Sequence, residues 1–291
     1  MHSIPNMKRS TLISTICAAA FSAVALPTFA AEGYTDTPMQ PNGKWHVHDP
    51  NRPHPPVVTP GKHFSDGADA PSDATVLFDG KDFSKWHGQK DEKKNPTGDV
   101  KWKIEDGYME TTSTGVIWTK DEFGSFQMHL EWATPKDIHG KDGKVLHGQG
   151  RGNNGINIHG RYEIQVLDSY DNPTYADGQA SAIYGQQPPR FNASRPPGEW
   201  QTYDIFFEAP KFDEKGELKE KAYVTVLHNG ILVHNRQEIL GRTNHREIGT
   251  YKGAKSTGPI QLYEHGNPVR FRNIWIRPLG EYDTPEKAPA K

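Results

Sequence analysis

Cysteine is almost missing from this chain of 291 residues. The single cysteine, Cys17, lies in an apolar run near the N-terminus. The sequence after residue 30 therefore has neither a disulfide framework nor a thiol nucleophile. A hydrophobic core must stabilise the fold, and roughly 260 residues are enough for one large domain.

The chain also lacks long basic runs and phosphate-binding loops. Its formal net charge is −2, so we expect no nucleic-acid partner. The glycine-rich run at residues 148–152 has neither the lysine nor the helix of a phosphate cradle, so we expect no nucleotide either. Beyond residue 30, no apolar stretch approaches the roughly 20 residues that span a bilayer, which argues against a membrane anchor.

The N-terminus has the pattern of an export signal. Lys8 and Arg9 precede an apolar run from Leu12 to Leu26, and small residues lead up to Ala30. This arrangement predicts a signal peptide over residues 1–30, with cleavage after Ala30 or, as the alternative, after Ala31. We therefore expect a periplasmic or secreted protein.

Composition divides the remainder into three parts. Residues 31–72 are rich in proline and poor in aliphatic side chains, which predicts an extended strap or linker. Residues 73–280 carry the strand signals and form the predicted folded domain. Residues 281–291 are short and charged, and we expect a frayed tail.

Helical periodicity is scarce, whereas strand periodicity recurs. Apolar side chains alternate with polar ones from Phe126 to Trp132 and from Tyr203 to Phe207. Two β-rich segments flank Asn229-Gly230, a strong hairpin signal. The sequence thus predicts an all-β protein, an antiparallel β-sandwich of the jelly-roll type with a concave sheet that could bind a ligand.

The most informative segment is a predicted hairpin at residues 153–169. Ile156 and Ile158 share one face of the first arm, and Tyr162, Ile164 and Val166 share one face of the second. The opposite face then carries polar groups: Asn157, His159, Arg161, Glu163 and Gln165. An ordinary solvated strand face would explain the alternation. The amide, imidazole, guanidinium and carboxylate groups together favour binding of sugar hydroxyls.

The sequence offers three acidic residues for catalysis, Glu131, Glu163 and Asp168. Direct glycoside hydrolysis usually needs two carboxylates facing each other across the bond. Glu163 is followed at alternate positions by Gln165 and Leu167, so a strand with three alternating acids is absent. Glu131, from another strand, could still pair with Glu163.

Other chemistry has weaker support in the sequence. No pair of histidines has the close spacing typical of zinc sites. A divalent cation such as calcium remains possible, with Asp168 as a candidate ligand. Most tryptophans should lie in the core, but Tyr184 and Trp200 adjoin Gly/Pro-rich loops and could stack on a pyranose ring.

An ordered series of motifs resembles the 3-keto-disaccharide hydrolase domain family, and it extends from Ala74 to Leu279. It comprises residues 77–86, 102–107, 154–169, 182–185, 198–200, 228–230, 258–262 and 269–274. The resemblance implies a concanavalin-like jelly roll in a secreted bacterial protein that acts on 3-keto-glycosides. His159 stands where an arginine is common in the family. If that arginine binds substrate in other members, its role here could pass to His159 or Arg161.

A ketone at C3 acidifies the C2 proton of a sugar, so the C1 substituent can leave by elimination before water adds. This route needs one base and a group that stabilises the enolate. We predict Glu163 as the base, with His159, Arg161 or a bound cation at the ketone. The remaining residues would bind substrate: Asn157, Gln165, Gln261, Tyr184, Trp200 and Glu131. A non-catalytic carbohydrate-binding module and a conventional glycoside hydrolase are the alternatives.

Overall fold

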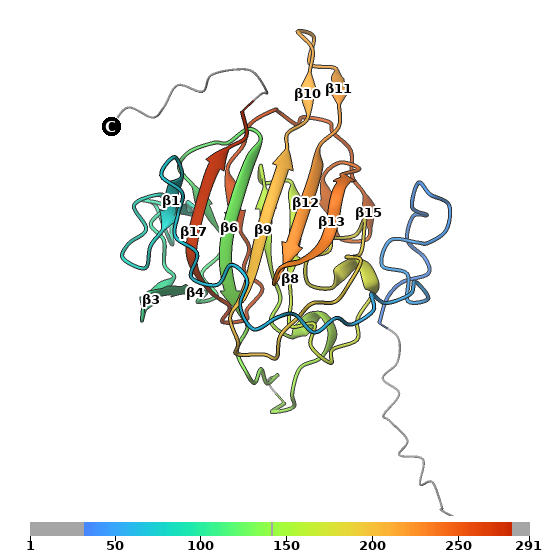
Figure 1. Ribbon diagram of the computed structural model, residues 1–291, viewed down its shortest axis with the longest axis horizontal. Coiled ribbons are helices and arrows are strands. Elements are labelled where there is room, and N and C mark those ends of the chain that lie inside the picture. The colour runs from blue at the N-terminus through green and yellow to red at the C-terminus, as the bar shows by residue number, and fades with distance from the viewer. Residues whose placement is uncertain (1–31, 141, 281–291) are drawn as a thin grey trace, which may run out of the picture. The chain divides into compact units, whose positions relative to one another are not determined.

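Two antiparallel sheets dominate the computed structural model, which describes residues 32–140 and 142–280 (Figure 1). The predicted signal peptide and C-terminal tail lie outside the described residues. The described part contains no α-helix, only two short 3-10 helices, η1 (Gly148–Gly150) and η2 (Ala176–Gly178). No helix there has the length and apolar character needed to cross a membrane. The prediction of an all-β sandwich is confirmed.

The larger sheet has eight strands, all paired in antiparallel fashion. Its order is β13 (Ile231–Glu238), β12 (Tyr223–His228), β9 (Gln201–Glu208), β6 (Phe126–Ala133), β17 (Arg270–Pro278), β4 (Tyr108–Glu110) and β3 (Lys103–Glu105). The eighth strand, β1 (Thr75–Phe78), also pairs with β17. The first and last strands of the domain are therefore hydrogen-bonded neighbours.

The smaller sheet has five strands and is also antiparallel. Its order is β2 (Trp86–Gly88), β5 (Ile117–Thr119), β16 (Ile260–Leu262), β7 (Asn154–Ile158) and β8 (Tyr162–Val166). Two short hairpins complete the fold: β10 (Lys211–Phe212) with β11 (Leu218–Glu220), and β14 (Thr243–Asn244) with β15 (Glu247–Ile248).

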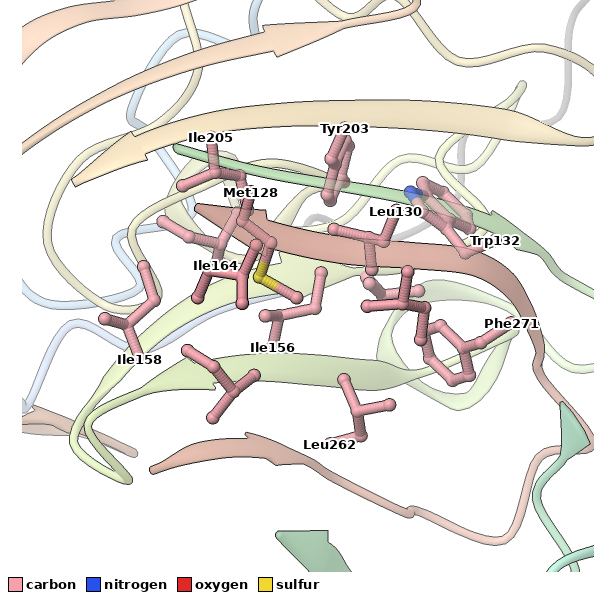
Figure 2. Packing of buried hydrophobic residues seen from close by; sticks show 14 of the residues in the cluster. Met128, Leu130, Trp132, Ile156, Ile158, Ile164, Tyr203, Ile205, Leu262 and Phe271 are labelled. Carbon is pink, nitrogen blue, oxygen red and sulfur yellow. The ribbon is translucent and has the colours of Figure 1, made fainter. Parts of the chain in front are cut away.

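The core lies between the two sheets. Met128 and Leu130 of β6 face Ile156 of β7 and Ile164 of β8 in Figure 2, and all four are fully buried. The alternating apolar residues predicted from residues 126 to 132 and 203 to 207 belong to this cluster. Because strand side chains alternate between faces, their polar neighbours must lie on the outer faces of the sheets.

The Asn229-Gly230 turn confirms the strongest hairpin signal. Both residues have left-handed backbone conformations, with φ of 51° and 81°, and they join β12 to β13. A two-residue turn of this kind needs positive φ at both positions, which asparagine and glycine tolerate.

The proline-rich strap packs along the domain over much of its length. Its residues cross the outer face of the larger sheet, where Gly67 N donates to Glu131 of β6 (2.6 Å) and Ser65 Oγ donates to Asp204 of β9 (2.7 Å). Nearer the N-terminus, Val47 and His48 are fully buried. The strap cannot form a core by itself, but it finds partners on the sandwich.

Candidate active site

A row of polar side chains crosses the outer face of the smaller sheet. Gln261 of β16 is the register partner of Asn157 on β7, and Asn157 is the partner of Glu163 on β8. Neighbouring strands lie about 4.8 Å apart, so the three side chains form a line across the sheet. The prediction that Asn157 and Glu163 share one face is confirmed, and Gln261 lies on the same face.

Gly155 creates room for the Glu163 carboxylate. Gly155 lies two residues before Asn157 on β7 and pairs with Gln165. A Cβ atom at Gly155 would lie only 2.1 Å from Glu163 Oε1, closer than any side chain allows. The missing side chain thus lets the carboxylate fold over the neighbouring strand.

A cleft of about 330 Å³ opens beside this row. Its walls come from β8, from the β14–β15 hairpin with its flanking residues, and from the segment after β16. The lining residues are Asn153, Glu163, Gln165, Tyr184, Arg242, Thr243, Asn244, His245, Tyr263 and His265. The cleft therefore brings a carboxylate, amides, imidazoles, phenols and a guanidinium together.

Glu163 is held in an environment that favours its neutral form. The residue is 8% exposed, and burial raises the pKa of its carboxyl group to about 8. The Gln165 amide nitrogen lies 3.1 Å from Glu163 Oε1 when oriented to donate. Thr243 Oγ1 accepts the Glu163 backbone N–H (3.0 Å), which fixes β8 against the β14–β15 hairpin. A carboxyl group with a pKa near neutrality suits proton transfer.

Tyr184 forms part of the wall together with His245. Tyr184 Oη lies 3.0 Å from both His245 Nδ1 and Tyr175 Oη. The Tyr184 backbone N–H donates to the Glu163 carbonyl oxygen (3.1 Å), which ties this wall to β8. Burial raises the pKa of the Tyr184 hydroxyl well above its usual value, so the hydroxyl stays protonated and can donate a hydrogen bond.

The cleft continues into a second basin of about 450 Å³ next to the strap. Asn153, Tyr184 and His245 line both spaces. Glu32, Gly33 and Tyr34 of the strap line the second basin. The strap therefore contributes directly to the candidate site.

A buried, hydrogen-bonded pair of residues, His48 and Asp177, supports this wall from behind. Asp177 accepts hydrogen bonds from the His48 backbone N–H and from Nδ1, both at 3.0 Å. The His48 ring centroid lies 4.0 Å from that of Tyr175 and 4.8 Å from that of Tyr184. His48 therefore connects the strap to the tyrosines beside the cleft.

His159 and Arg161 do not line the cleft, contrary to expectation. His159 and Gly160 have φ of 56° and 62° and form the turn between β7 and β8, so strand alternation ends at Ile158. The His159 ring packs edge-on against Phe207, with centroids 4.9 Å apart. Arg161 Nη2 donates to the Lys252 carbonyl oxygen (2.8 Å) and so holds a surface loop.

Glu131 and Trp200 lie away from Glu163, so the proposed pair of acids does not form. Glu131 projects from the outer face of the larger sheet, where Arg272 (2.7 Å) and Asn273 (3.0 Å) bind it. Glu163 projects from the outer face of the smaller sheet, so the core separates the two carboxylates. Trp200 lines a separate groove.

Asp168 is placed in an ion pair rather than in a cation site. Arg151 Nε lies 2.7 Å from Asp168 Oδ2, and the Tyr170 N–H donates to Oδ1 (3.2 Å). Within the described ranges, no group of three or more His, Cys, Asp or Glu residues is arranged to hold a metal ion.

Sequence reasoning missed several residues of the cleft: Asn153, Arg242, Thr243, Asn244, His245, Tyr263 and His265. Most belong to loops or to short hairpins, where periodicity gives no guide to side-chain direction. Tyr263 had a usable signal, because it lies two residues after Gln261 and so shares its face. Its backbone N–H donates to the Gly155 carbonyl oxygen (2.9 Å), which extends the pairing of β16 with β7.

Comparison with known proteins identifies related sequences and structures. Residues 73–277 match the family model of the 3-keto-alpha-glucoside-1,2-lyase-like domain. A crystal structure described as a "putative glycosyl hydrolase" from Parabacteroides distasonis ATCC 8503, at 2.13 Å resolution, is 45% identical. The match covers 78% of this chain and 93% of that one, with a TM-score of 0.64.

A second structure with the same description and organism, at 1.70 Å, is 21% identical and has a TM-score of 0.51. That match covers 71% of this chain and 94% of the other, and it supports the fold alone. No curated protein matches the chain. The extent of the family match and the 45% identity over most of both chains lead to one conclusion: the chain belongs to the 3-keto-alpha-glucoside-1,2-lyase-like domain family of carbohydrate-active proteins.

Proposed function

We propose that the cleft cleaves the glycosidic bond of 3-keto-glycosides by elimination, followed by addition of water. The observation that carries this proposal is Glu163, a buried carboxyl group whose pKa is raised to about 8 in a polar cleft. It is the only carboxylate among the described residues that line this cleft. A single base with a pKa near neutrality suits the removal of a proton next to a ketone, whereas direct hydrolysis of a glycoside normally uses two carboxyl groups.

In the proposed reaction, Glu163 removes the proton from C2 of the sugar. The electron pair is first held as the enolate of the C3 ketone, and it then forms the C1–C2 double bond as the bond between C1 and the glycosidic oxygen breaks. The departing oxygen takes a proton from a donor on the cleft wall, for which Tyr184 and His245 are the candidates. Water then adds across the double bond, giving the free 3-keto sugar.

The developing enolate needs a positive partner at the ketone oxygen. Arg242 is the guanidinium that lines the cleft, so it replaces Arg161 in this role. Asn157, Gln165 and Gln261 carry amides on the same sheet face and can hold sugar hydroxyls. Stabilisation of developing charge by fixed donors is commonly a large contribution to catalysis.

The test compares 4-nitrophenyl 3-keto-glucoside with its unoxidised parent, using the native protein and Glu163→Gln. We expect the native protein to release nitrophenol from the keto sugar only, and the variant to be at least about 100-fold slower. Undiminished turnover by Glu163→Gln would remove Glu163 as the base.

Parallel assays decide between the alternatives. Cleavage of both substrates would indicate a conventional glycoside hydrolase. Saturable binding of sugar without cleavage of either would indicate a carbohydrate-binding module. Loss of activity under a chelator would add a divalent cation to the mechanism.

A further inference from the structure

A second cavity, of about 740 Å³, lies between the strap and the loop that precedes β9. Val58 and Lys62 line it from the strap, and Ser194 and Trp200 line it from the loop. No described residue lines both this groove and the cleft that contains Glu163. We name the cavity the Trp200 groove.

The two walls of the Trp200 groove are held together by Arg195. Its guanidinium binds Asp66 (2.6 Å) and donates to the carbonyl oxygens of Gly61 (3.2 Å) and Lys62 (3.0 Å) on the strap. It also donates to the Trp200 carbonyl oxygen (2.7 Å) on the loop. The shape of the groove is therefore set before any ligand binds, which lowers the entropic cost of binding.

Trp200 is oriented by the larger sheet. The Arg272 guanidinium of β17 lies 4.0 Å from the centroid of the indole ring, and Glu131 binds Arg272 in turn at 2.7 Å. Tyr170, which is 39% exposed, is a second aromatic residue in the lining. Flat aromatic faces of this kind pack against the C–H face of a sugar ring.

Polar groups and charge balance indicate the class of ligand. Ser194 Oγ is buried without a hydrogen-bond partner in the described structure, and Ser194 lines the groove. The two arginines are already neutralised, Arg195 by Asp66 and Arg272 by Glu131. Lys62 and Glu199 also line the groove and carry opposite charges. Because these charges balance, the groove offers little attraction to an anionic ligand, whereas aromatic rings and hydroxyl groups suit a neutral sugar.

We propose that the Trp200 groove is a second carbohydrate-binding site, which holds a neutral hexose oligosaccharide by stacking on Trp200. The site is independent of chemistry in the cleft, so the protein binds unoxidised glycan at a place where it does not cleave it.

Calorimetric titration with cellotetraose and with maltotetraose tests the proposal. The native protein and Glu163→Gln should both bind one of these sugars saturably. Trp200→Ala should bind it about tenfold more weakly or worse, while cleaving 4-nitrophenyl 3-keto-glucoside at the native rate. Tyr170→Ala, at an exposed position, should weaken binding without risk to the fold.

Two outcomes would overturn the proposal. One is native-like affinity in both Trp200→Ala and Tyr170→Ala, which would place any binding outside the Trp200 groove. The other is the absence of binding of both tetrasaccharides by the native protein. Neither outcome depends on whether Glu163 proves to be the base.

Discussion

Gly155 and Glu163 occupy adjoining space on the outer face of the smaller sheet, so that a Cβ atom at position 155 would lie 2.1 Å from Glu163 Oε1. This relationship links a residue without a side chain to the proposed base. It also makes the position of the carboxylate open to test without changing the carboxylate itself.

Gly155→Ala should displace the Glu163 carboxylate and slow the cleavage of a 3-keto-glucoside by about 100-fold, because a shift of about 1 Å can cost that much. Steady-state kinetics would measure the loss. Gly124→Ala is the matched control, since its Cβ would meet its nearest neighbour at 3.7 Å. If Gly155→Ala cleaved the substrate at the native rate, the present position of the Glu163 carboxylate would not be important for catalysis.

Activity should rise with pH because the proposed base must be deprotonated. Burial raises the pKa of Glu163 to about 8, so kcat/KM should increase through that pH and level off above it. Rates measured from pH 5 to pH 10 give the profile. A profile that levels off near pH 5 would mean that Glu163 is not the group that titrates.

The same pKa shift should make stability depend on pH. Between the ordinary carboxyl pKa of 4.5 and about 8, the native protein keeps a proton on Glu163 that the unfolded chain has lost. The stabilising contribution of Glu163 is therefore at its maximum below pH 4.5. Between pH 4.5 and about pH 8, the free energy of unfolding falls by about 1.4 kcal/mol per pH unit. Urea denaturation at a series of pH values should show this fall in the free energy of unfolding for the native protein but not for Glu163→Gln. Equal slopes would contradict the assigned environment.

The polar network under the strap should lose stability at high pH. Burial alone would lower the pKa of His129, but hydrogen bonds to Asp204 and Glu131 outweigh it and raise the pKa to about 9. The stabilising contribution of protonated His129 is thus complete below pH 6.5 and is lost as the pH rises through about 9. His129→Gln should remove this loss, as measured by thermal unfolding between pH 6 and pH 10. His139→Gln, at an exposed loop position, is the control and should leave the loss in place.

Asp177→Asn should destabilise the protein and loosen the wall of the cleft. Asp177 is fully buried and accepts two hydrogen bonds from His48, while Arg52 lies 3.7 Å away. Breaking a buried ion pair from one side commonly costs about 3–5 kcal/mol. Chemical denaturation would measure the cost, and Asp69→Asn, at an exposed strap position, serves as the control. A change below about 1 kcal/mol would mean that the pair is not important for stability.

Part of the candidate site could be predicted from the sequence through the period of two along a strand. That period placed Asn157, Glu163 and Gln165 on one polar face, and the structure agrees. Gln261, on another strand, joins them through its pairing with Asn157. The same reasoning failed at His159 and Arg161, because the alternation was continued through a turn. Positive φ at His159 and Gly160 takes the backbone out of the strand conformation, so the alternation does not extend to the side chains of His159 and Arg161.

The sequence by itself determined the individual strands, their buried faces and the Asn229-Gly230 turn, because these depend on neighbours in the chain and on the burial of apolar side chains. Only the tertiary structure decided which residues form the cleft. Arg242 and His245 belong to the β14–β15 hairpin with its flanking residues and Tyr184 to the segment after β8, and the strap adds Tyr34 beside them. Tertiary structure likewise separated Glu131 and Trp200 from Glu163. Distances between such segments depend on how the sheets pack, which no local pattern encodes.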